Sequence, residues 1–360
     1  MRDLYCNFTI IRNGADYGQI RPVLDSLPTL RMDDSGDIKI SLSGDFYPTV
    51  YDFDGKPIPD AEVDWLTDQI RPELVIDGVE HHLGIYLPAT VIVTEDTGGY
   101  GFRSLHVEAY DRCWQVQDSR LESLLHLSAN SNYITVIQQL LTAAGIGTVS
   151  ATPSTAVLPE DREDWSIGTS RLEVINQLLS EINYNPLWFD SEGWAILEPA
   201  SVPSAVNIEH TLDGADDISL VLPQNQRQTD IYSAPNVWIC VCSNPDKSGP
   251  MVATAENTNP QSPLSVDRRG RRICKLVTLS NIASQDELQA YADRLRNESM
   301  ITGETIMIET GLLPGHGVRD VVGVSYGDLL AVTIERAWTM DLGPGGTMSH
   351  KLDKVVINLG

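Results

Sequence analysis

The sequence predicts a mainly β protein in which an α+β region lies between two β-rich regions. Residues 1–122 and 300–360 contain many short stretches in which apolar and polar residues alternate, as in half-buried strands. Between them, apolar residues recur at helical spacing beside residues that typically begin or end helices. A chain of 360 residues is also too long for one ordinary core, so two or three domains are expected.

The first β-rich region predicts an antiparallel barrel or sandwich. In the stretch DIKISLSGDF, every second residue from Ile38 onward is apolar or glycine. Two more strands are expected around Asp77 and Gly78, a pair that suits a tight hairpin turn, and others between residues 89 and 116. Closure into a barrel would protect the edges of so many strands.

Two amphipathic helices and a hairpin are predicted in residues 123–200. The helices lie in SNYITVIQQLLTAAG and SRLEVINQLLSE, and in the second Ser170 and Glu173 have the spacing of a capping box. A hairpin follows, with its turn at residues 190–193. The large aromatic residues of this region are expected to provide structural packing, and they are Trp165, Trp188, Phe189 and Trp194.

The remainder of the chain predicts strands, a loop-rich stretch, a helix and strands again. DDISLVLP and NVWICVCS are expected to be strands, and residues 243–272 are rich in loop-forming residues. A third helix is predicted in SQDELQAYADRLRNESM, where Ser284 and Glu287 repeat the S-x-x-E spacing. Near the end, GPGGT lies between two predicted strands and is expected to be a hairpin turn.

Composition and charge exclude several classes of protein. With 50 acidic against 25 basic side chains the formal charge is −25, which argues against nucleic acid as a main ligand, because that binding relies on Lys and Arg. A solvated acidic surface explains the charge most simply, and a basic partner or a lumen that carries a polyanion is the alternative. No signal peptide or membrane span is expected. The five scattered cysteines suggest free thiols and a reducing compartment during folding.

No catalytic, cofactor-binding or metal-ligating residue is expected. Cys240 and Cys242 lie on one face of a predicted strand, but no second ligand pair accompanies them, so we expect buried thiols without a metal or a disulfide. His106 and Glu108 lack the cysteine motif of a zinc deaminase, and no G-x-S-x-G hydrolase motif occurs. DFDGKPIPDAE has too few acidic ligands for a calcium loop, so a turn is expected.

One basic cluster stands out against the acidic background. It consists of Arg268, Arg269, Arg271 and Arg272. A solvated turn is the more common explanation of such a run. Because an acidic partner or a neighbouring subunit would also suit it, the cluster is a candidate interface.

Several motifs, in order along the chain, resemble those of the hub proteins of phage tails and contractile injection machines. WSIGTSRLEVINQLLSEINYNPLWFDSEGWAILEP resembles the family's W-x-I/V-G-T-S lead, its I-N-x-L-L helix and its aromatic hairpin. APNVWICVCSNPDKSGPMVATAENTNPQSPLSVDRRGRR resembles the family's P-N-x-V-x-V strand, A-T-A-x-N loop and G-R-R turn. ERAWTMDLGPGGTMSHKLDKV resembles its last hairpin, and together the matches cover roughly residues 100–360.

The resemblance implies the architecture of such a hub. Each chain would carry two tail-tube-like antiparallel β-barrel domains plus an intervening α+β domain. The first barrel would be 1–122, and 201–240 with 300–360 would form the second. The α+β domain, from 123–200 and 241–299, would brace the barrels. A homotrimer would then present six barrels and adapt a six-fold tail tube to a three-fold spike or fibre.

The resemblance also implies a location and partners. The protein would belong to the tail tip or baseplate of a virion and would be assembled in the host cytoplasm. Its partners would be two further copies, the tail tube or distal tail protein, and a spike or central fibre protein, with the tape measure protein and passing DNA in the lumen. A tail-associated cell-wall or polysaccharide hydrolase, and a receptor- or glycan-binding tail module, are the alternatives.

Overall fold

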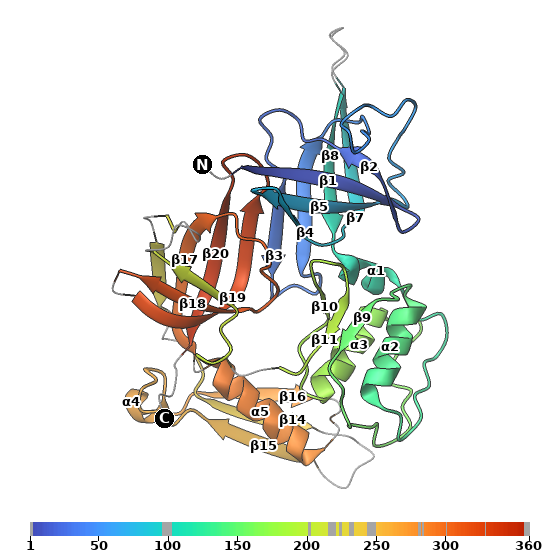
Figure 1. Ribbon diagram of the computed structural model, residues 1–360. Helices are drawn as coiled ribbons and strands as arrows, with labels where there is room; N and C mark the ends of the chain where they lie inside the picture. Colours follow the sequence, from blue (N-terminus) through green and yellow to red (C-terminus); the bar gives the residue numbers. More distant parts are fainter. Residues whose placement is uncertain are drawn as a thin grey trace.

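The computed structural model shows a mainly β chain with several antiparallel sheets and a smaller helical part (Figure 1). This confirms the predicted fold class. The predicted strand DDISLVLP lies mostly outside the described residues. The residues that the structure describes are 3–95, 103–200, 203–214, 221–222, 225–229, 234–242, 250–279, 282, 284–299, 301–327 and 329–355.

The first β-rich unit consists of two sheets that cross each other (Figure 1). One sheet has the strand order β2 (Ala15–Ile20), β1 (Leu4–Arg12), β5 (Gln69–Ile76) and β6 (Val79–His82). The strands of the other are β3 (Thr29–Asp33), β4 (Ile40–Phe46), β8 (Arg103–Tyr110) and β7 (Leu87–Glu95). Isolated bridges between Pro22 and Phe46 and between Ile70 and Tyr86 connect the two sheets.

The local sequence explains these strands. In β4 every second residue is buried, as the alternation predicts, and Leu42 and Phe46 are fully buried. Asp77 and Gly78 both have positive φ, 50° and 82°, and connect β5 to β6 in the tight turn that the sequence predicts. Phe8 on β1 packs edge to face on Phe46, with ring centroids 5.0 Å apart, so the two sheets share one core.

The second β-rich unit is a curved sheet formed mostly by the end of the chain. As predicted, GPGGT forms the turn between two neighbouring strands of this sheet, Leu329–Asp341 and Thr347–Val355, and Gly345 has a φ of 78° there. Among the described residues, no pairing joins the first strand of this sheet to the last. The order is β12 (His210–Asp213), β18 (Val321–Tyr326), β19 (Leu329–Asp341), β20 (Thr347–Val355), β17 (Ile301–Gly311) and β13 (Asn225–Thr229).

The strand β19 connects the two β-rich units. Its first half pairs with β18, and its second half pairs with β3 of the first unit, where Trp338 lies opposite Met32 and Met340 opposite Leu30. Because β3 also pairs with β4, strands of both units form one ten-stranded sheet. Trp338, Met340 and Met348 accordingly lie in the core of the first unit. The two units are therefore joined by backbone pairing and by a shared core.

The helical unit contains α1 (Arg112–Asp118), α2 (Tyr133–Ala143) and α3 (Arg171–Glu181). These helices pack with a small sheet of β10 (Trp188–Phe189), β11 (Ala195–Leu197) and β9 (Val149–Ala151). The core runs from Cys113 to Leu197, so the unit begins before the predicted boundary at residue 123. At the start of α3 the Ser170 hydroxyl oxygen accepts a hydrogen bond from the Glu173 amide at 3.1 Å, which confirms the predicted cap.

A fourth unit differs from the predicted domain plan. Its sheet has the order β15 (Met251–Glu256), β14 (Val237–Cys242) and β16 (Cys274–Leu279), covered by α5 (Gln285–Ser299). The prediction assigned residues 201–240, and with them most of β14, to the second barrel, and residues 241–299 to the α+β domain with the first helices. β14 instead pairs with β15 and β16, because its buried Cys240 and Cys242 complete the apolar surface that Leu288 and Ala292 of α5 need.

Candidate functional site

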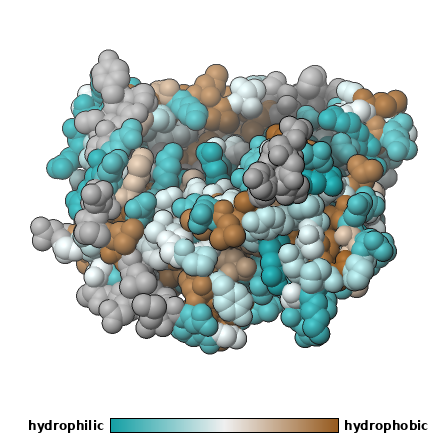
Figure 2. Space-filling view, turned by 90° about the horizontal axis from the view of Figure 1, so that it is seen from above, coloured by the Kyte–Doolittle hydropathy of each residue, from teal (hydrophilic) through white to brown (hydrophobic). Residues whose placement is uncertain are grey.

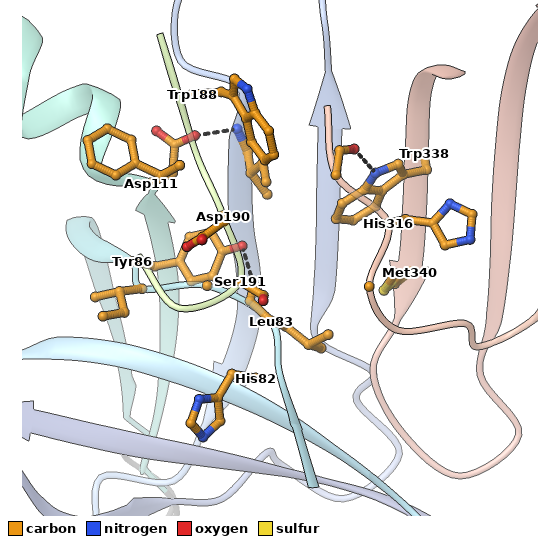
Figure 3. A pocket seen from close by; sticks show the side chains of 16 residues that line it. His82, Leu83, Tyr86, Asp111, Trp188, Asp190, Ser191, His316, Trp338 and Met340 are labelled. Atoms are coloured by element: carbon orange, nitrogen blue, oxygen red, sulfur yellow. Dashed lines mark hydrogen bonds between the residues drawn. The ribbon is translucent and has the colours of Figure 1, made fainter. Parts of the chain in front are cut away.

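The hairpin of the helical unit meets both β-rich units at a narrow pocket of about 30 Å³ (Figure 3). Trp188 of β10 and Trp338 of β19 both line it. The Trp338 indole Nε1 donates to the Gly317 carbonyl oxygen at 3.1 Å, and the Tyr86 hydroxyl donates to the Leu83 carbonyl oxygen at 2.7 Å. A space of this size holds about one water molecule. The pocket is therefore a packing junction rather than a substrate pocket.

A buried aspartate fastens the first β-rich unit to the helical unit at this junction. Asp111 Oδ2 accepts a hydrogen bond from the Ile40 amide of β4, and Oδ1 accepts one from the Cys113 amide as the cap of α1, both at 2.9 Å. Burial raises the pKa of Asp111 to about 6, although its hydrogen bonds oppose that shift. One side chain thus satisfies backbone donors of two units.

A buried ion pair links elements of the helical unit. Arg162 Nη1 lies 2.6 Å from Glu181 Oε2, and both side chains are almost fully buried. The Tyr133 hydroxyl donates to the same carboxylate oxygen at 2.9 Å. Burial raises the pKa of Glu181, and the neighbouring guanidinium partly counters it. The network links α2, α3 and the segment between them.

A second buried polar cluster occupies the interior of the second β-rich unit. The Glu335 carboxylate on β19 lies between two imidazoles: Oε2 is 2.7 Å from His316 Nδ1, and Oε1 is 2.5 Å from His350 Nδ1. His350 Nε2 in turn lies 2.9 Å from the Thr310 hydroxyl. His210 stacks on His316 with ring centroids 3.9 Å apart. The cluster therefore brings together residues from β12, β17, β19, β20 and the loop before β18.

The electrostatics of this cluster follow from burial and pairing. Burial alone would raise the pKa of Glu335, but the hydrogen bonds and charges of His316 and His350 lower it to about 2. Burial lowers the pKa of the His316 imidazole. The Asp320 carboxylate, whose Oδ2 is 3.1 Å from His210 Nε2, raises the pKa of His210. The two imidazoles thus stabilise the ionised form of the carboxylate at the centre of the cluster.

Two exposed surfaces of the β-rich units can receive neighbouring chains. A groove of about 620 Å³ crosses the seam between the two units, where it is lined by Arg31 of β3 and by Met307 and Glu309 of β17, among others. The edge strand β7 exposes Ile92 and Val93. In the face seen from above, hydrophobic residues form separate patches among hydrophilic ones (Figure 2). An edge strand with apolar side chains readily pairs with another chain.

The predicted packing residues divide into buried and exposed ones. Trp165 and Phe189 are buried, and Trp188 is partly buried with its Nε1 3.2 Å from Glu198 Oε1. Trp194 was expected to be buried, but 44% of its surface is exposed. The reason is its place just before β11, because the next residue, Ala195, occupies the inward-facing position.

The predicted arginine cluster lies at α4 (Val266–Arg269) and the turn after it, apart from the junction pocket and the histidines. Arg269 Nη1 donates to the Ala234 carbonyl oxygen at 2.6 Å, and Arg272 pairs with Glu256. Arg268 and Arg271 are exposed. Two of the four arginines thus support local structure, and two present their charge to the solvent.

Three further expectations from the sequence concern two cysteines, one turn and membrane-spanning helices. Cys240 and Cys242 are buried thiols in the core beneath α5, and the absence of a bound metal stays a prediction. The DFDGKPIPDAE stretch forms a turn in which Asp52 Oδ1 accepts from the Asp54 and Lys56 amides. No helix in the described part of the chain is both long and apolar enough to cross a membrane.

The positions of Asp111 and of the Glu335 cluster were not predicted from the sequence. The spacing between Ile40 and Asp111, or between His316 and His350, matches no motif. The available signal for Asp111 was its place directly before a helix, where aspartate is a common cap. No comparable local signal marks Glu335, since its partners are defined by strand pairing.

Comparison with known proteins identifies the fold. No family model and no curated protein matches the sequence. A tail protein from Neisseria meningitidis MC58 superposes with a TM-score of 0.62 at 14% identity, over 97% of this chain and 96% of that one. The 43 kDa tail protein of prophage MuSo2 from Shewanella oneidensis gives 0.63 at 11% identity, over 96% and 98% of the two chains.

A third solved structure extends the likeness to a secretion machine. It is a component of the E. coli type VI secretion system, described as structurally similar to the phage T4 tail proteins gp27 and gp5. Its TM-score is 0.51 at 11% identity, over 94% of this chain and 76% of that one. At such identities the likeness concerns the fold. The predicted resemblance is confirmed at that level, and the chain has the fold of phage tail proteins.

Proposed function

We propose that this protein is a structural baseplate hub of a phage tail or a phage-like injection particle. Three copies form a ring that adapts a six-fold tail tube to a three-fold spike or fibre and continues the lumen. The ring belongs to the tail tip of the virion and is assembled in the host cytoplasm. Its neighbours are the tail tube or distal tail protein, the spike or fibre, and the tape measure protein.

The pairing of β3 with β19 carries this proposal. It sets two β-rich units side by side in one sheet within a single chain, with five residue pairs from Ala337–Asp33 to Asp341–Thr29. Two such units per chain give six in a trimer, which matches six-fold symmetry on one side and three-fold symmetry on the other. The shared core around Trp338 keeps the two units in a fixed relation.

The helical units support the proposal as braces. The hairpin that contains Trp188 packs against both β-rich units at the junction pocket, and Asp111 joins the start of α1 to β4. Rigid relative placement is useful in a ring that transmits load between a tube and a spike. These contacts are structural, and the proposed role is non-enzymatic.

The acidic composition supports an acidic lumen. Duplex DNA carries one charge per ~1.7 Å of axis, so a basic bore would bind it through counterion release and slow its passage. We propose that acidic side chains outnumber basic ones on the bore, and that the cluster Arg268–Arg272 lies away from it. Electron cryomicroscopy of assembled particles tests this by the count of charged side chains on the bore, and a net basic bore contradicts it.

Isolated protein tests the non-enzymatic part of the proposal. The purified chain should give no clearing in a zymogram of host cell walls and no binding on a glycan array. A lytic band that persists in repeated preparations would favour the alternative, a tail-associated hydrolase. Saturable binding to one glycan class would favour a receptor-binding module.

A further inference from the structure

The buried cluster around Glu335 has the composition of a metal site. Two imidazoles and one carboxylate are a common ligand set of zinc in proteins. Ligand atoms of His316, Glu335 and His350 all lie within 4.8 Å of one another. At most 1% of any of the three side chains is exposed. Three of the chain's seven histidines, counting His210, gather in this one place.

The backbone around the cluster is shaped to aim these side chains inward. A β-bulge interrupts the pairing of β19 with β20 between Glu335 and Ala337. Such bulges often redirect a side chain beside a functional site. His316 lies in a tight loop where Gly315 and Arg319 have φ values of 89° and 66°. Positive φ at a non-glycine residue is strained, and strain of this kind concentrates at binding and catalytic sites.

Hydrogen bonds from neighbouring groups hold the proposed ligands in place. The Thr310 hydroxyl, which also contacts the Gly311 carbonyl oxygen at 2.7 Å, lies 2.9 Å from His350 Nε2. The Gly317 amide donates to Asp320 Oδ2 at 2.7 Å, which fixes the loop that carries His316. Metal-binding imidazoles typically use their other nitrogen in contacts like that of His350.

We propose that His316, Glu335 and His350 bind one divalent transition metal ion, with Zn²⁺ the best match, through the two Nδ1 atoms and the carboxylate. Zinc–nitrogen and zinc–oxygen bonds of about 2.0–2.2 Å place tetrahedral ligand atoms roughly 3.3 Å apart. The present separations of 2.5 and 2.7 Å from the carboxylate oxygens to Nδ1 would each have to lengthen by less than about 1 Å to reach that value.

Metal binding displaces the hydrogen atom that each imidazole donates to Glu335. Each Nδ1 gives up the hydrogen that it now donates to Glu335 and binds the ion with the freed lone pair. The hydrogen moves to Nε2, or to solvent if the ring was already doubly protonated. On His350, Nε2–H then donates to the Thr310 oxygen. The cluster lies between two hollows of the chain, since His316 lines the junction pocket and His350 lines the groove.

Metal analysis of the whole chain tests the proposal. Protein stripped with a chelator should take up one Zn²⁺ per chain in a calorimetric titration and melt at a higher temperature with zinc. The substitutions Glu335→Gln and His350→Asn should each weaken zinc binding by at least about 10–100-fold. The matched control is His126→Asn, which removes an exposed histidine paired with Glu163 at 3.0 Å and should leave the affinity unchanged.

X-ray absorption of the zinc-loaded wild-type chain keeps the proposal testable if a core variant fails to fold. The expected spectrum has nitrogen and oxygen ligands with imidazole scattering and no sulfur. Sulfur ligation would point to the cysteines and overturn the proposal. Failure of the folded wild-type chain to take up stoichiometric zinc would show that the cluster is a hydrogen-bonded core network only. Neither result depends on the proposed hub role.

Discussion

Met32 on β3 and Trp338 on β19 lie opposite each other in neighbouring antiparallel strands, although they come from the two ends of the chain. This pair lies in the seam between the two β-rich units. Met32 is fully buried and Trp338 is 4% exposed. Because the seam combines backbone pairing with a common core, we expect the two units to unfold together rather than separately.

Truncation of the seam tryptophan tests that coupling. Trp338→Ala should lower the free energy of unfolding by about 3–5 kcal/mol, because it removes a large buried side chain. The indole hydrogen bond to Gly317 is lost as well. Trp194→Ala is the matched control, since Trp194 is 44% exposed, and it should cost less than about 1 kcal/mol. Denaturant unfolding followed by circular dichroism measures both, and equal effects would contradict the assigned burial.

The pH dependence of stability should depend on Asp111. Its pKa is about 6 in the folded chain against an ordinary value of 3.8, so the folded state retains a proton over this interval that the unfolded state loses. The contribution of Asp111 to stability is therefore complete below about pH 4 and declines as the pH rises through 6. Comparison of Asp111→Asn with wild type should show a difference in unfolding free energy that shrinks over this interval and is constant above pH 7.

The same substitution has an effect at neutral pH. An asparagine has one acceptor oxygen, so it can serve either the Ile40 amide or the Cys113 amide. Loss of one buried acceptor should cost about 1–3 kcal/mol. Asp118→Asn, at an exposed carboxylate at the end of α1, is the control for a charge change of the same sign. A wild-type slope that survives Asp111→Asn would assign the pH dependence to other groups.

The buried ion pair of the helical unit should respond in a non-additive way. Arg162→Met leaves the Glu181 carboxylate buried without its partner and should destabilise the chain by about 3–5 kcal/mol. Arg162→Met combined with Glu181→Leu removes both charges and should recover most of that loss. A double-mutant cycle with thermal unfolding measures the coupling. Additive losses would show that the two side chains act independently.

The exposed arginines offer a test of partner binding. Arg268→Glu with Arg271→Glu reverses two exposed charges, so the unfolding free energy should change by about 0.5 kcal/mol or less. If the cluster is an interface, tail assembly in a complementation assay should fall while the isolated chain stays folded. Lys56→Glu, at an exposed side chain in the DFDGKPIPDAE turn, is the control for a charge reversal away from the cluster and the groove. Normal assembly of the double variant would identify the cluster as a solvated turn.

Local patterns predicted the local structure well. The alternation in β4, the cap at Ser170, the Asp77-Gly78 turn and the GPGGT turn depend on neighbouring residues alone, and each is present. The exposure of Trp194 was not predicted, because the sequence does not define where β11 begins. The inward and outward positions of a short strand exchange when its start shifts by one residue.

Long-range structure was harder to predict for a physical reason. The sequence of β14 predicts a strand but does not indicate which sheet that strand joins. The apolar face of α5, which lies more than forty residues later, decides this pairing. The Glu335 cluster depends on a bulge in β19 and on the register of β19 with β20. Neither the bulge nor the register produces a recognisable residue spacing in the sequence. Residues such as His316 and His350 therefore become neighbours only in the folded chain.

The mass of the assembled hub is the sharpest test of the proposed three-chain ring. Native mass spectrometry of the purified protein, and of hub complexes released from assembled particles, gives the number of chains of 39.6 kDa in each species. We expect a trimer, either free in solution or formed within the assembled tail. A stable dimer in solution, with no trimer in assembled particles, would contradict it.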